Sequence, residues 1–122
     1  MPDLSEVEIR GEDNFPVLAK RTGFLASQAA LSAIFAAGNP DGRELDIEAS
    51  LIPEQANVHD SKAVRIDVGS KGVGYLASED ARVYRRRWGR RPSRVAARII
   101  SKPHPSFPAM DVYTLRLDLP LR

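Results

Sequence analysis

Apolar and polar residues alternate with a period of two in three separate segments, at residues 45–51, 63–68 and 112–119. Successive side chains of a β-strand point to opposite faces, so this alternation is typical of strands with one buried face. Further short strands are expected at residues 7–9, 73–76 and 95–100. Short strands therefore account for much of the chain.

Helices are expected at fewer places. Residues 24–37 are rich in Ala and Leu and are followed by Gly38, which predicts a helix that ends there. Ser78 is a typical N-cap residue and Gly89 a typical helix terminator, so a second helix is expected from Ser78 to about Trp88. A third, short helix is expected to begin at Pro16, run through Val17, Leu18 and Ala19, and be stopped by Gly23.

About six strands and two or three helices predict a mainly β protein of the α+β class. The strands do not alternate regularly with helices, which disfavours a parallel doubly wound sheet. A small, OB-like antiparallel β-barrel fits this order best, and 122 residues are enough for one domain spanning residues 1–122. Small barrels of this kind often present a strand face to nucleic acid.

Several classes of function are disfavoured. The chain has no cysteine, which excludes disulfides, thiolate nucleophiles and cysteine zinc sites, and His59 and His104 lie far apart, so neither a metal nor another cofactor is expected. No carboxylate cluster typical of a magnesium site is visible, so we expect no enzyme. A metal-dependent nuclease built on Asp13 and Asp60 is the one catalytic alternative. Without an export signal or a membrane-spanning stretch, a cytoplasmic protein that does not bind membranes is expected.

Positive charge is concentrated late in the chain. Residues 81–110 hold nine of the 18 basic residues and none of the 16 acidic ones, and eight of the nine are arginines. Such asymmetry is typical of a protein that binds a polyanion, and the planar guanidinium suits phosphate oxygens. The alternative is a solvated surface whose charge is balanced by acids elsewhere in the fold. The predicted phosphate contacts are Arg85, Arg86, Arg87, Arg90, Arg91 and Arg94.

A central motif carries a family resemblance. Glu54, Asn57, Asp60 and Ala63 lie three residues apart, and Val73-Gly74-Tyr75-Leu76 follows about ten residues later. This order resembles the HIRAN domain, whose pattern has an acidic residue, Asn-Pro-Tyr/His-Asp, Ala-Val/Ile and then Val-Gly-Tyr/His-Leu. The opening residues 7–12 are also similar to the family's first strand and glycine turn.

The resemblance implies a fold and a ligand. HIRAN domains are modified OB-like barrels, known as accessory modules of fork-remodelling helicases that capture the 3′-hydroxyl end of single-stranded DNA. By position, Asn57, His59 and Asp60 would line the end-binding pocket, and Asn14 and Phe15 would form a second wall. A non-catalytic, single-stranded-DNA-binding module in DNA repair or processing is therefore expected, with a helicase or a nuclease as its partner.

The sequence also departs from the family pattern. Val58 replaces the usual proline, and the family members that bind DNA ends carry tyrosine at the position of His59 and an Arg-Tyr pair where this chain has Asp13-Asn14. A protein-interaction adaptor that keeps the fold without binding DNA is therefore the main alternative. Asn57 and Asp60 are also common turn residues, because their side chains bond the nearby backbone.

Overall fold

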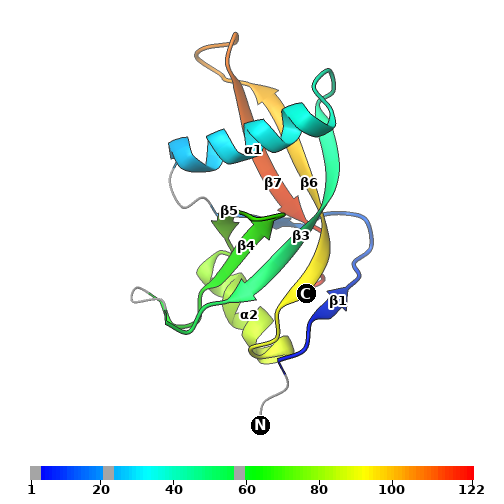
Figure 1. Cartoon of the computed structure of the whole chain (residues 1–122), viewed down its shortest axis with the longest axis vertical. Coiled ribbons are helices and arrows are strands. Elements are labelled where there is room, and N and C mark those ends of the chain that lie inside the picture. The colour runs from blue at the N-terminus through cyan, green and yellow to red at the C-terminus, as the bar shows by residue number, and fades with distance from the viewer. Residues whose placement is uncertain (1–3, 21–23, 57–59) are drawn as a thin grey trace.

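The computed structural model describes residues 4–20, 24–56 and 60–122 (Figure 1). Within these residues the elements follow one another in the order β1 (Val7–Ile9), β2 (Val17–Leu18), α1 (Phe24–Gly38), β3 (Glu44–Pro53), β4 (Val64–Val68), β5 (Lys71–Tyr75), α2 (Ser78–Trp88), β6 (Ser93–Pro103) and β7 (Asp111–Leu117).

The strands form one curled sheet in the order β2-β7-β6-β3-β4-β5. All neighbours in this order are antiparallel, while β1 adds to β6 in parallel, with Val7 opposite Ser93. The two ends of the sheet meet where Lys20 and Tyr75 exchange backbone hydrogen bonds of 2.7 and 2.8 Å. The expected small OB-like fold of the α+β class is confirmed.

The period-two alternation in the sequence becomes the two faces of this sheet. Along β6, Val95, Ala97 and Ile99 are buried while Arg94 and Ala96 are exposed. The buried residues of the other strands meet them in one core, which also contains Leu51, Ile66, Leu115, Leu117 and Leu119.

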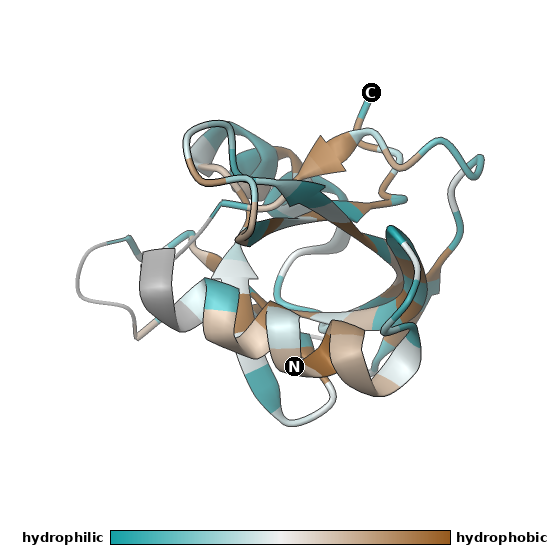
Figure 2. Ribbon diagram, turned by 90° about the horizontal axis from the view of Figure 1, so that it is seen from above, coloured by the Kyte–Doolittle hydropathy of each residue, from teal (hydrophilic) through white to brown (hydrophobic). Residues whose placement is uncertain are grey.

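Helix α1 lies across the open side of the curled sheet (Figure 2). Leu31 and Phe35 are buried there, and the Phe35 ring packs against Tyr113 of β7 at 5.5 Å between ring centres. The Gln28 amide donates to the Tyr113 carbonyl (2.8 Å) and accepts from the Tyr113 N–H (2.7 Å). One side chain thus satisfies both backbone groups of Tyr113 where they face the helix.

Helix α2 packs beneath the lower half of the sheet (Figure 1). The buried Tyr84 hydroxyl donates to the Arg91 carbonyl at 2.6 Å and lies 2.9 Å from Ser93 Oγ. The Tyr84 ring packs against Trp88 at 5.1 Å between ring centres. The helix ends at Gly89, whose φ of 62° is favourable for glycine and whose N–H bonds the Arg85 carbonyl.

Two local expectations are wrong. Residues 16–19 form no helix: β2 pairs with β7, and the Ala19 N–H donates to the Leu115 carbonyl at 2.9 Å. A helix that must end before Gly23 is too short to be stable on its own, whereas β7 offers an unpaired edge. Ser78 is not the N-cap, a position taken by Ala77 without a side-chain cap. Leu76 still pairs with Val64, so the chain enters the helix directly from the sheet and Ser78 already lies in the first turn.

Candidate nucleic-acid interface

Three arginines project from the outer side of α2 and its end without a carboxylate partner. Arg82 and Arg86 are four residues apart, so they lie on one side of the helix, and Arg90 follows just after Gly89. All three are exposed, and no described acidic residue forms an ion pair with any of them. Glu79 of the first turn lies on the same side of the helix, so three positive charges there face one negative charge.

Arg85 anchors α2 to the segment that leads into β4. Its Nη2 donates to the carbonyls of Ser61 (3.1 Å) and Ala63 (3.2 Å), while its buried Nε has no hydrogen-bond partner. Burial lowers the pKa of Arg85, the nearby charge of Arg90 lowers it further, and Asp60 partly opposes both. The structure thus brings residues 60–63 and the arginine helix together.

A hollow of about 300 Å³ opens between these two segments, lined by Lys62, Arg82, Arg85 and Arg86. All four lining residues are cations. Together with Arg90 they form what we call the basic face: Lys62, Arg82, Arg85, Arg86 and Arg90. Positive side chains that converge on one hollow without intervening carboxylates suit an anion.

Asp60 lies next to the basic face but already has a structural role. Its Oδ1 accepts the Lys62 N–H at 2.8 Å, and its carbonyl accepts the Ala63 N–H at 3.1 Å. This turn presents the carbonyls of Ser61 and Ala63 to Arg85. The other two residues expected in the end-binding pocket, Asn57 and His59, lie outside the described residues.

The two residues expected to form the second wall of the end-binding pocket, Asn14 and Phe15, do not lie near Asp60. Asn14 and Phe15 belong to the segment between β1 and β2, which Figure 1 shows at the opposite side of the sheet from residues 60–63. Phe15 is 6% exposed, and the guanidinium of Arg98 covers its ring at 4.2 Å. Asn14 is exposed and lines a separate hollow with Pro16. The Phe15 ring is therefore not open to a stacking base.

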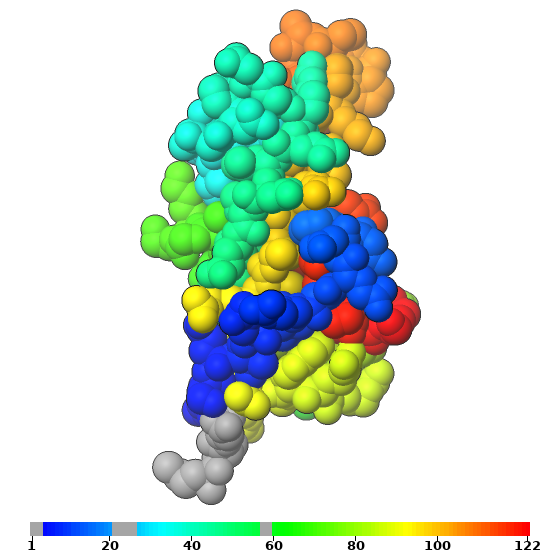
Figure 3. All heavy atoms as spheres, turned by 90° about the vertical axis from the view of Figure 1, so that its right-hand side faces the viewer, coloured from blue at the N-terminus to red at the C-terminus, as the bar shows by residue number. Residues whose placement is uncertain are grey.

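On the face shown in Figure 3, β1 and the 10–16 segment lie against the C-terminal residues. Asp118, from this C-terminal segment, accepts the N–H groups of Asp13 (2.9 Å) and Phe15 (3.3 Å). These two hydrogen bonds hold the 10–16 segment in place, although Asp13 and Phe15 have a positive φ, which is unfavourable for residues other than glycine.

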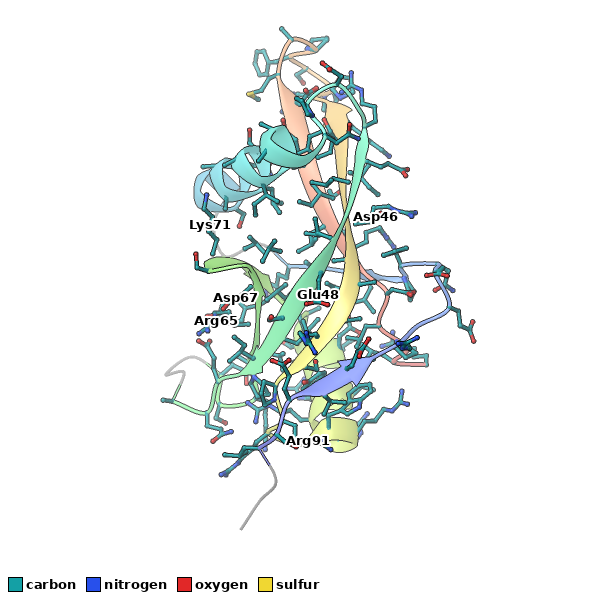
Figure 4. All side chains as sticks on the ribbon, turned by 45° about the vertical axis from the view of Figure 1, so that its right-hand side comes forward. Asp46, Glu48, Arg65, Asp67, Lys71 and Arg91 are labelled. Carbon is teal, nitrogen blue, oxygen red and sulfur yellow. The ribbon has the colours of Figure 1, made fainter. Side chains whose placement is uncertain are left out.

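The remaining predicted phosphate contacts already have partners within the fold. Arg94 forms ion pairs with Glu6 and Glu48, so its charge is balanced by acids within the fold. Arg91 bonds the Ser5 carbonyl and hydroxyl, and Arg87 donates to the Pro120 carbonyl and lies over the Trp88 ring. Figure 4 shows Arg91 near the base of the molecule and Glu48 on β3.

Two residues of the basic face were absent from the sequence-based contact set. Arg82 carried a usable signal, because it lies one helical turn before Arg86. Lys62 carried none, since its position beside α2 follows from how the segment before β4 folds back onto the helix.

A separate polar network joins β3, β4 and β5. Glu54 accepts the Tyr75 hydroxyl (2.7 Å) and Arg65 Nη1 (2.8 Å), and Arg65 Nε donates to Asp67 at 2.9 Å (Figure 4). The hydrogen bond to Glu54, and then burial, raise the pKa of Tyr75. The donors and acceptors of this network satisfy one another, so it serves chiefly to hold the strands together.

Among residues 4–20, 24–56 and 60–122, no three His, Cys, Asp or Glu side chains are grouped so as to hold a metal ion. The same residues contain no helix with the length and apolar character needed to cross a bilayer.

The chain was also compared with known proteins. No family model, no curated protein and no solved structure matches it.

Proposed function

We propose that the chain is a non-catalytic module that binds the sugar–phosphate backbone of nucleic acid, with single-stranded DNA as its ligand. The observation that supports this most strongly is the basic face, in which cations from α2 and from the segment before β4 converge without carboxylate partners in the described structure. Elsewhere arginines such as Arg94 and Arg98 face acids.

The chemistry of the basic face favours phosphate over bases. Stacking needs an open ring, and Tyr84 and Trp88 of α2 pack against each other, with Arg87 over the Trp88 ring. Arginine and lysine contacts to phosphate position a strand without reading its sequence. We therefore expect binding with little dependence on sequence.

A single strand fits the arrangement better than a duplex. The cations converge on one hollow from a helix and from a tight turn beside it. A flexible single strand can bring its phosphates to one hollow, whereas bending a duplex over a short distance costs free energy. The 3′-hydroxyl preference implied by the resemblance stays a prediction and forms no part of this proposal, because Asp60 Oδ1 already bonds its own main chain.

Fluorescence anisotropy with a labelled oligonucleotide tests the proposal. If all five side chains of the basic face each neutralise one phosphate, log K should fall with log salt with a slope of about −3.5. Duplex DNA of the same length should bind more weakly. Arg86→Gln combined with Arg90→Gln should weaken binding of every sequence tested, whereas Arg10→Gln, which removes an exposed arginine beside Glu8, should not. Absence of binding at low salt would refute the proposal.

A protein-interaction adaptor is the second candidate, and one observation favours it. Phe107 is 65% exposed and Met110 47% exposed in the connection between β6 and β7, at the opposite end of the molecule from α2 (Figure 1). Exposed large apolar side chains that lie close together are common at protein contacts. If no oligonucleotide binds, the function of a protein-interaction adaptor is better supported than that of a nucleic-acid-binding module.

A further inference from the structure

The hollow in the basic face is more charged than a single internal phosphate requires. Lys62, Arg82, Arg85 and Arg86 line it, and a phosphodiester carries one negative charge. A phosphate monoester carries a charge of about −1.5 to −2 at neutral pH and has three strong acceptor oxygens. A monoester therefore matches the charge and the number of donors of the hollow better than a diester does.

Arg85 gives the hollow a fixed element. Its Nη2 is held by the carbonyls of Ser61 and Ala63, and these bonds fix the plane of the guanidinium. Its Nε is buried without an acceptor, although a buried donor without a partner costs free energy. Burial and Arg90 also make the charged form of Arg85 less favourable, as its lowered pKa indicates. A multiply charged anion beside Arg85 would relieve this electrostatic cost.

The other cations of the hollow are free to adjust. Arg82, Arg86 and Lys62 are exposed, and their side chains have no hydrogen bond or ion pair to any described residue. A fixed guanidinium surrounded by three exposed cations offers several donors to a terminal group that presents three oxygens. An internal diester presents only two free oxygens and must also leave the hollow on both sides.

We infer that the hollow formed by Lys62, Arg82, Arg85 and Arg86 binds a phosphate monoester at the end of a nucleic acid strand. The inference rests on the proposed function, because it names the strand end that the basic face prefers. The same chemistry occurs at a 5′-phosphate and at a 3′-phosphate, and the experiment distinguishes them.

The test uses three internally labelled oligonucleotides of one sequence, with a 5′-phosphate, a 3′-phosphate or hydroxyls at both ends. One phosphorylated form should bind about tenfold more tightly than the hydroxyl form at low salt, and this preference should shrink as salt screens the added charge. The form that gains affinity identifies the strand end.

Two matched variants distinguish binding of the phosphorylated end in the hollow from attraction by the overall positive charge of the surface. Arg86→Gln removes a cation that lines the hollow, so the preference for the phosphorylated end should fall to about twofold or less. Arg90→Gln removes a cation of the basic face that does not line the hollow, so it should weaken all three oligonucleotides equally and keep the preference.

Three results would overturn the inference. Equal affinity for the three oligonucleotides refutes it and leaves the proposed function intact. A preference that Arg86→Gln and Arg90→Gln reduce equally also refutes it, because the effect then comes from overall charge. Absence of binding by every oligonucleotide refutes the proposed function together with the inference.

Discussion

Asp118 is a carboxylate that lies almost wholly inside the molecule, with 2% of its surface exposed. Its two oxygens accept the backbone N–H groups of Asp13 and Phe15, two non-glycine residues with φ of 61° and 45°. Arg116 supports the same segment by donating to the carbonyls of Phe15 and Pro16. A backbone conformation that costs free energy persists here because several polar groups hold it.

We predict that Asp118→Ala destabilises the protein by about 2–4 kcal/mol, because the buried N–H of Phe15 and the partly buried N–H of Asp13 both lose their acceptor. Asp118→Asn keeps one acceptor oxygen and should cost roughly half as much. Asp111→Ala is the matched control, since its ion pair with Arg43 is exposed to solvent and contributes at most about 1 kcal/mol. Urea unfolding measures all three variants. A cost for Asp118→Ala as small as that for Asp111→Ala would contradict the role assigned to this carboxylate.

Tyr75 leads to a prediction about alkaline pH. The hydrogen bond to Glu54 raises the folded-state pKa of Tyr75 above the ordinary value of about 10, so the folded state favours the neutral phenol. The stability this contributes is fully present below pH ~10 and is lost as the pH rises through the folded-state pKa. Glu54→Gln removes the negative charge and should move the Tyr75 titration, followed by absorbance near 295 nm, toward lower pH.

A Tyr75→Phe variant assigns that titration, because the component that moves must be absent from it. If Glu54→Gln leaves the tyrosine titration unchanged, the Glu54 carboxylate is not what raises the pKa.

At the scale of elements, the sequence predicts best where one residue pattern decides the outcome. The alternation over residues 45–51 predicts most of β3 because its apolar face is partly buried at Leu45 and Ile47 and fully buried at Ala49 and Leu51. Gly89 predicts the end of α2 through its positive φ. The 16–19 segment could not be predicted, because β2 exists through its backbone pairing with β7, about 100 residues later. The role of Gln28 could not be predicted from the sequence either, because its amide bonds the backbone of Tyr113, which lies 85 residues later.

The junction that joins the two ends of the sheet depends on a glycine. A Cβ on Gly74 would lie 2.5 Å from the Lys20 carbonyl oxygen, which accepts the Tyr75 N–H. Gly74→Ala should therefore destabilise the protein by about 1–3 kcal/mol and increase hydrogen exchange at the amides of Lys20 and Tyr75.

Gly69→Ala is the control for this variant. Gly69 has a φ of 61° and open space around it, so alanine there causes local strain only. Its exchange effect should stay within the connection between β4 and β5. If both variants increase exchange at Lys20 equally, close approach at Gly74 does not explain the junction.

For the whole molecule, the distribution of charge in space differs from that along the chain. The basic region from 81 to 110 includes arginines of β6 that face acids, whereas Arg82, Arg86 and Arg90, on or just after α2, form no ion pair with a described acidic residue. Arg98 pairs with Asp46, which lies 52 residues earlier. The sequence therefore predicts that positive charge is concentrated, but the residues left unpaired follow from strand pairing between distant segments.

This division predicts that removing a paired arginine and removing an unpaired one have opposite consequences. Arg94→Gln should leave oligonucleotide affinity and its salt slope nearly unchanged, and should lower the free energy of unfolding by at most about 1 kcal/mol, because its ion pairs are exposed. Arg82→Gln combined with Arg86→Gln should reduce the salt slope by about 1.4, at roughly 0.7 per phosphate contact, and leave stability within about 0.5 kcal/mol. Anisotropy titrations at several salt concentrations measure the salt slope, and urea unfolding of the same preparations measures the stability.

One outcome would contradict this prediction. If Arg94→Gln reduces the salt slope as much as either helix substitution does, the acids around Arg94 do not neutralise its charge. The distinction between the two groups of arginines would then fail.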